Sequence, residues 1–133
     1  MSHRKLYRAA NDAIVMQGTS FASLKSSARE YLDNLGFGGS TLYVAEIEVD
    51  SETVLDARGM DVDAVAEMLG MASPGAIGVD EWIGRSVAAQ EAARAAGYLW
   101  VIVDESYPVD TTTWIWVGES TDDEPEMEEC EST

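Results

Sequence analysis

The segment DEWIGRSVAAQEAARAAGYLWVIV, residues 80–103, gives the clearest structural signal in the chain. Asp80 is a good helix N-cap and Gly97 is a good helix terminator, so the spacing predicts a helix over residues 80–96. Its alanine-rich middle allows close approach to a sheet. Residues 98–103 are apolar at nearly every position, which predicts a strand that is covered on both faces.

Outward from this segment, hydrophobic periodicity predicts two more helices and several strands. Helical spacing of apolar residues predicts helices over 23–35 and 61–69, and alternation predicts a half-buried strand over 41–50. Further strands are expected at residues 5–9, 17–22, 53–57 and 111–117, and Trp114 and Trp116 share one face of the last. This order predicts one α+β domain over residues 1–118 with mostly antiparallel strands.

The charge of the chain is strongly negative, with 25 acidic residues, 8 basic residues and a formal net charge of -17. Such a surface excludes direct nucleic-acid and anionic-membrane partners. Residues 119–133 are acidic, lack apolar periodicity and contain Pro125, which predicts a disordered acidic tail. The excess of acidic residues has three interpretations: a solubilising tail, mimicry of a nucleic acid toward a basic partner, or adaptation to a cytoplasm at high salt.

Features that the sequence lacks argue against a membrane-spanning helix, a metal centre and histidine-based catalysis. The longest apolar run, residues 99–103, is far shorter than the ~20 residues of a spanning helix. No apolar region follows the charged first residues, so we expect a cytoplasmic protein. With Cys130 as the single cysteine and His3 as the single histidine, neither a metal centre nor a Ser–His–Asp mechanism is expected. Any catalysis therefore uses Arg, Tyr, Ser, Thr or carboxylates.

Three short N-terminal motifs resemble the ADP-ribosyltransferase fold family. They are Leu6-Tyr7-Arg8, Gly18-x-x-Phe21-x-Ser23 and Ala28-x-x-Tyr31. The length, the acidity and the Ala-Ala-Gly-Tyr sequence before a buried strand are similar to those of small phage anti-CRISPR transferases. The resemblance implies an α+β fold with two small, mostly antiparallel sheets around a cleft and three helices.

The same resemblance assigns cofactor-binding roles. It implies that Arg8, with Tyr7 beside it, binds the ribose and phosphates of NAD, and that Phe21 and Tyr31 sandwich the nicotinamide. Thr19-Ser20 lies where the family has a short motif that braces the site. Each assignment has a structural alternative, because a strand arginine often pairs with a surface acid and aromatic residues at element junctions often belong to the core.

The catalytic pair implied by the resemblance is Arg8 and Glu81. A carboxylate would stabilise the positive charge that develops at the anomeric carbon when the nicotinamide bond breaks. Other candidates for this role are Glu91, Asp104 and Glu105. The structural alternative for Glu81 is an ion pair with Arg85, four residues further along the predicted helix.

The implied function is NAD-dependent mono-ADP-ribosyl transfer to a host protein, in an anti-defence or toxin-like role for a phage or mobile element. The alternative is a non-catalytic acidic binding protein that inhibits a nucleic-acid-binding partner by charge mimicry. A third possibility is a housekeeping domain whose charge reflects a high-salt cytoplasm.

Overall fold

The structure is a computed structural model that describes residues 2–30, 41–105, 111–118 and 125–132. The strands in these ranges are β1 (Ser2–Ala10), β2 (Ser20–Ala22), β3 (Thr41–Val49), β4 (Val54–Asp56), β5 (Trp100–Glu105), β6 (Thr111–Trp116) and β7 (Met127–Ser132). The α-helices are α1 (Lys25–Glu30), α2 (Val62–Met68), α3 (Val79–Arg85) and α4 (Val87–Ala95), and a 3₁₀ helix (Ser51–Thr53) precedes β4. The chain is therefore a mixed α+β protein, as the sequence predicted.

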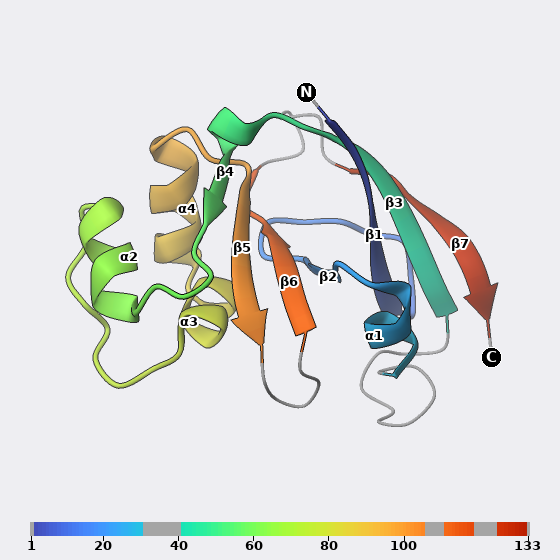
Figure 1. The fold of residues 1–133 in the computed structure, drawn as a ribbon, viewed down its shortest axis with the longest axis horizontal. Coiled ribbons are helices and arrows are strands. Elements are labelled where there is room, and N and C mark those ends of the chain that lie inside the picture. The colour runs from blue at the N-terminus through green and yellow to red at the C-terminus, as the bar shows by residue number, and fades with distance from the viewer. Residues whose placement is uncertain (1, 31–40, 106–110, 119–124, 133) are drawn as a thin grey trace.

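The strands form a single seven-stranded sheet in the order β4-β5-β6-β2-β1-β3-β7. Neighbours are antiparallel except β4 and β5, which are parallel. A parallel pair needs a crossover connection, because the second strand must start at the same end of the sheet as the first. Here α2, α3 and α4 form that crossover and lie together at the β4–β5 end of the sheet (Figure 1).

The described residues form one sheet where the sequence analysis expected two small ones. β2 pairs with β1 through Ala22 and Tyr7, and it pairs with β6 through Phe21 and Trp114. This short strand therefore joins β1, β3 and β7 on one side to β4, β5 and β6 on the other. Its backbone N–H and C=O groups have partners on both sides, which a gap between two separate sheets would not provide.

The segment expected to form one helix over residues 80–96 forms two, so the described residues contain four α-helices instead of three. The break is at Ser86, whose backbone is extended with φ -90° and ψ 109°. The Ser86 hydroxyl accepts a hydrogen bond from the Ala89 backbone N–H at 3.1 Å. Serine favours this capping role over a helix interior, and α4 therefore starts anew at Val87.

The expected disordered tail also differs, because part of it belongs to the sheet. Within 119–133, residues 119–124 and 133 lie outside the described residues, but Met127–Ser132 forms β7 and pairs with β3. Met127 is buried in register with Ala45, between exposed Glu126 and Glu128. One buried side chain and a ladder of backbone hydrogen bonds give this acidic segment a place at the sheet edge.

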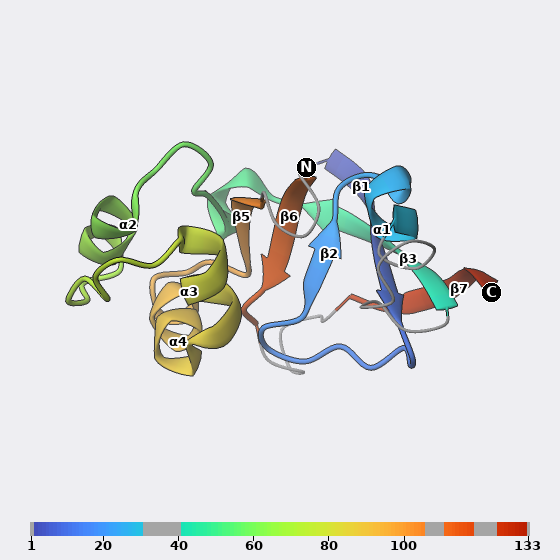
Figure 2. The same cartoon turned by 90° about the horizontal axis from the view of Figure 1, so that it is seen from below.

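The two faces of the sheet bury different cores. On one face, α2, α3 and α4 pack against Val101 and Val103 of β5, Ile115 of β6 and Val117 directly after β6. The alternate side chains of these strands point to the other face and include Trp100, Ile102, Trp114 and Trp116, which pack with Leu6 and Phe21. Figure 2 shows α3 and α4 beside β5 and β6, while α1 lies over β1 and β2. No helix within the described ranges is long and apolar enough to cross a membrane.

Candidate functional site

Arg8 and Ser20, two of the predicted site residues, lie together on the neighbouring strands β1 and β2. Arg8 Nη1 donates a hydrogen bond to the Ser20 carbonyl oxygen at 2.9 Å and lies 3.5 Å from the Ser20 hydroxyl. Its Nε is buried and has no hydrogen-bond partner among the described residues. Burial lowers the pKa of the Arg8 guanidinium, and the charge of nearby Asp12 acts in the opposite direction. Arginine stays charged under these conditions, so Arg8 is a half-buried cation that braces two strands.

Tyr7 and Thr19 do not share the surroundings of Arg8. Successive strand residues point to opposite faces, so Tyr7 lies on the face covered by α1 and packs beside Ala22, Ala28 and Leu42. The hydroxyl of buried Thr19 accepts a hydrogen bond from the Met16 backbone N–H at 3.0 Å. Both residues therefore have structural roles in the described part of the chain.

Phe21, the predicted nicotinamide-stacking residue, belongs to the core. Its side chain is 1% exposed and meets the ring of Trp100 edge to face, with 5.6 Å between the ring centroids. A ring that is already covered by a neighbouring strand offers no free face to a cofactor. The second predicted stacking residue, Tyr31, lies outside the described residues.

Glu81 lies on the opposite face of the sheet from Arg8. It is exposed on α3, and its Oε1 is 2.9 Å from Arg85 Nη1, which is the ion pair that the helical spacing predicts. α3 packs on the face of Val101 and Ile115, whereas Arg8 is in register with Tyr43 on the Trp114 face. The structure therefore does not bring the predicted catalytic pair together.

The other candidate carboxylates are dispersed over the described surface. Glu91 is exposed on α4, and Asp104 is exposed near the end of β5. Glu105 accepts a hydrogen bond from the Thr113 hydroxyl on β6. No group of three or more His, Cys, Asp or Glu side chains in the described ranges is placed to hold a metal ion.

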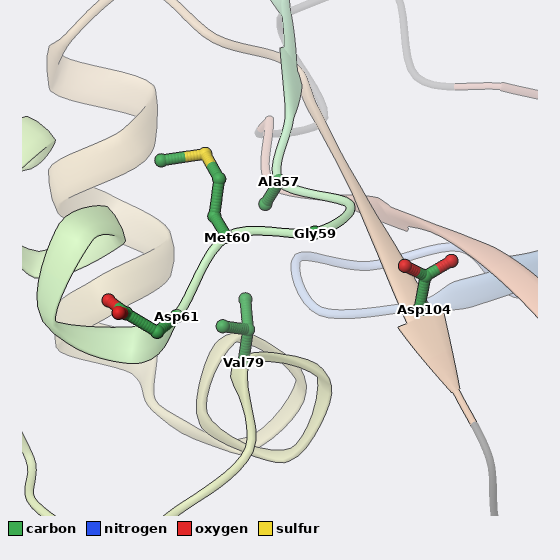
Figure 3. A pocket seen from close by; sticks show the side chains of 6 residues that line it. All are labelled: Ala57, Gly59, Met60, Asp61, Val79 and Asp104. Carbon is green, nitrogen blue, oxygen red and sulfur yellow. The ribbon is translucent and has the colours of Figure 1, made fainter.

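A hollow of about 360 Å³ lies where the loop after β4 meets β5 and α3 (Figure 3). Its lining residues are Ala57, Gly59, Met60, Asp61, Val79 and Asp104. The Asp61 carboxylate already accepts a hydrogen bond from the Ala64 backbone N–H, as the N-cap of α2. Two carboxylates without a cation in the lining would repel the phosphates of NAD, so this hollow does not fit the predicted cofactor.

A bidentate ion pair between Arg58 and Asp56 holds the loop beside this hollow, and it should make stability depend on pH. Arg58 Nε and Nη2 donate to the two carboxylate oxygens of Asp56 at 2.9 and 2.7 Å, and these hydrogen bonds lower the pKa of Asp56. The pKa of Asp56 is therefore lower in the folded protein than in the unfolded chain. The ion pair stabilises the fold at pH values above the unfolded-state pKa, and this stabilisation is lost as the pH falls through the folded-state pKa.

We expect Arg58→Gln to raise the pKa of Asp56 toward its ordinary value, as measured by carboxyl ¹³C NMR titration. The stability difference between this variant and the parent should vanish below the folded pKa of Asp56. Arg85→Gln is the matched control and should leave Asp56 unchanged. An unaltered Asp56 titration in Arg58→Gln would contradict the assignment.

Two neighbouring strands carry exposed acidic side chains that alternate with buried apolar ones. In the second half of β3, buried Ala45 and Ile47 alternate with exposed Glu46 and Glu48. At the start of β7, buried Met127 lies between exposed Glu126 and Glu128 and is in register with Ala45. The carboxylates therefore point to the opposite face. We call these four residues the acidic face: Glu46, Glu48, Glu126 and Glu128.

The acidic face is only partly neutralised. On β1, Lys5 is in register with Glu46, and His3 Nε2 lies 3.7 Å from Glu48 Oε1. β7 contains no basic residue and forms the edge of the sheet. Sequence reasoning missed this surface because it treated residues 119–133 as disordered. The signal that could have found it is the alternation of Glu126, Met127 and Glu128.

The comparisons with known proteins bear on the fold alone. No protein-family model matches the chain, and no curated protein matches it. A solved structure described as the crystal structure of an anti-CRISPR protein is similar over 96% of this chain and 95% of that chain, with 14% sequence identity and a TM-score of 0.53. The chain therefore has a fold like that of an anti-CRISPR protein. This likeness does not identify an ADP-ribosyltransferase fold.

Proposed function

We propose that the chain is an anti-defence protein that binds a cationic, nucleic-acid-binding host complex and blocks its nucleic-acid site. The observation that carries this proposal is the acidic face, because it presents carboxylates along β3 and at the start of the edge strand β7. Alternate residues on a strand are spaced by about 6.6 Å, so the sheet holds these charges in a regular array. A regular array of negative charge is what a phosphate-binding surface recognises.

The surrounding charge supports the same function. The net charge of -17 creates a negative field around the whole molecule. Such a field steers association with a basic partner and repels nucleic acid from the surface that the protein occupies. The similar solved structure is described as an anti-CRISPR protein, and this likeness of fold supports the anti-defence part of the proposal.

ADP-ribosyl transfer to a host protein is the competing function, and the contact between Arg8 and Ser20 is the observation that favours it. The transferase would use NAD, with Arg8 as the phosphate-binding cation. Against it stand the burial of Phe21 and the position of Glu81 on the other face of the sheet. These features favour a binding protein over a transferase.

The test is a competition assay with purified CRISPR effector complexes, Cas9 with its guide RNA among them. The chain should lower target-DNA binding at about 50 mM salt and lose most of this effect at about 300 mM, because exposed charge pairs are screened. Replacing the acidic face by glutamine (Glu46, Glu48, Glu126 and Glu128) should weaken inhibition about tenfold or more at low salt. The matched control changes four other exposed acids to glutamine (Glu30, Glu52, Glu67 and Glu91) and should inhibit more strongly than the acidic-face variant.

Equal inhibition by the two charge-matched variants would show that the acidic face has no special role. A mass increment on the effector that depends on NAD, survives denaturation and disappears in Arg8→Ala would instead establish the transferase. Absence of both inhibition and modification across the panel would refute the anti-defence proposal for these complexes.

A further inference from the structure

Residues 46–49, the second half of β3, have a partner strand on one side only. On the β1 side all of β3 is paired, and its last residue, Val49, lies opposite Ser2. On the other side β7 pairs only as far as Ala45, which is in register with Met127 (Figure 1). Beyond Ala45 no strand of the described residues lies on this side of β3. The described sheet therefore has an open edge along residues 46–49.

The end of the pairing has a local cause in the sequence. β7 begins at Met127, shortly after the buried Pro125. Proline has no backbone N–H, so it cannot donate to a ladder of hydrogen bonds. Successive residues of an antiparallel strand turn their N–H and C=O groups to alternate sides, so half of residues 46–49 turn theirs to the open side. Groups of this kind are the part of a sheet with which another extended chain can pair.

Exposed carboxylates line one face of this open edge. Glu46 and Glu48 are exposed, whereas Ile47 between them is buried in the core of the other face. On the closed side, β1 places Lys5 opposite Glu46 and His3 opposite Glu48. The strand that already pairs with this segment therefore meets each carboxylate with a basic side chain. Opposite charges on directly paired residues stabilise a sheet, and like charges destabilise it.

We propose that the open side of residues 46–49 receives an extended segment of the cationic host complex, with lysine or arginine at alternate positions, as an added strand. This inference rests on the proposed function and specifies how the partner is held. Main-chain hydrogen bonds supply affinity, and pairing of the basic side chains with Glu46 and Glu48 supplies specificity.

The charges select this occupant over a second copy of the chain. Antiparallel pairing of two such edges about Ile47 would place Glu46 of one molecule opposite Glu48 of the other, which destabilises the pair. Each molecule also has a net charge of -17, so two copies repel each other at long range. A strand with alternating basic residues meets neither obstacle, and β1 is an example of such a strand on the closed side.

The test titrates the isotope-labelled full chain with an octapeptide of alternating lysine and threonine at about 50 mM salt, where charge pairs are weakly screened. The largest changes in backbone amide chemical shift should fall on residues 46–49. Nuclear Overhauser contacts between α-protons of the peptide and α-protons of residues 46–49 should identify a paired strand, because paired antiparallel strands bring these groups together.

Two controls separate backbone pairing from attraction between charges. The same peptide with every backbone amide N-methylated keeps its charge but has no N–H to donate, so it should bind about tenfold or more weakly. Glu46→Gln with Glu48→Gln should weaken binding about fivefold or more. The matched control, Glu67→Gln with Glu91→Gln, removes the same charge from two exposed helical positions and should weaken binding by less than about twofold.

The outcomes separate this inference from the proposed function. Equal binding of the methylated and unmethylated peptides, or equal effects of the two charge-matched variants, would overturn the added strand. If the chain inhibits an effector complex but the peptide makes no contact with residues 46–49, this inference fails while the proposed function stands. If the peptide pairs there but the chain inhibits none of the complexes, the edge binds basic strands and its assignment to the host complex fails with the proposed function. A parental dimer in analytical ultracentrifugation that the peptide dissociates would identify a second copy as the occupant and overturn the assignment.

Discussion

Replacing Trp116 by alanine should lower the free energy of unfolding by about 3–5 kcal/mol, the range for removing a buried large aromatic side chain. Trp116 is 2% exposed, and its ring meets Trp100 edge to face with 5.1 Å between centroids. The surrounding packing is tight, since a Cβ added at Gly118 would lie 2.5 Å from Trp116 Cζ2. The residues around Trp116 belong to several strands, so they cannot collapse into the space without distorting the sheet.

Urea denaturation followed by far-ultraviolet circular dichroism measures this loss without relying on the fluorescence of the removed residue. Trp116→Phe is the informative control. It keeps an aromatic ring and removes an indole N–H that is buried without a hydrogen-bond partner among the described residues. Its cost should be less than half that of alanine, because loss of an unsatisfied donor offsets part of the cavity. Equal losses in the two variants would contradict this account of the core.

Local sequence patterns predicted much of this fold. The alternation over residues 41–50 corresponds to β3, and the apolar run over residues 98–103 corresponds to the covered strand β5. The shared face of Trp114 and Trp116 is confirmed as a core face. These features could be predicted because burial imposes a periodicity that can be read within one segment.

Features that depend on distant segments could not be predicted in the same way. β2 has three residues, and its bridging position depends on pairing with β6, a strand far away in sequence. β7 has one buried apolar residue, so its charge dominated the sequence signal. The break at Ser86 was missed because serine at that spacing fits both a helix interior and a cap.

The candidate site shows the same division. The ion pair of Glu81 with Arg85 follows from helical spacing and is confirmed. The contact of Arg8 with Ser20 depends on strand pairing between β1 and β2. The relative placement of Arg8 and Glu81 depends on which face of the sheet each element covers, and a short motif carries no information about that.

Gly18→Ala should lower the free energy of unfolding by about 2–4 kcal/mol, for two independent reasons. Gly18 has a backbone φ of 95°, a conformation that residues other than glycine rarely adopt. An added Cβ would also lie 2.9 Å from Gln90 Nε2. Gln90 cannot move away freely, because it is buried and its Nε2 donates to the Ile83 carbonyl oxygen at 2.8 Å. Displacing it would leave that buried carbonyl without its donor.

A double-mutant cycle with Gln90→Ala separates the two causes. If the methyl group acts partly by displacing Gln90, the double variant should be about 1 kcal/mol or more less destabilised than the sum of the two single variants. The cost that remains for Gly18→Ala in the Gln90→Ala background is then the backbone cost of the positive φ, about 1–2 kcal/mol. Strict additivity in urea denaturation would show that Gln90 yields without cost and that the backbone conformation alone requires glycine at this position.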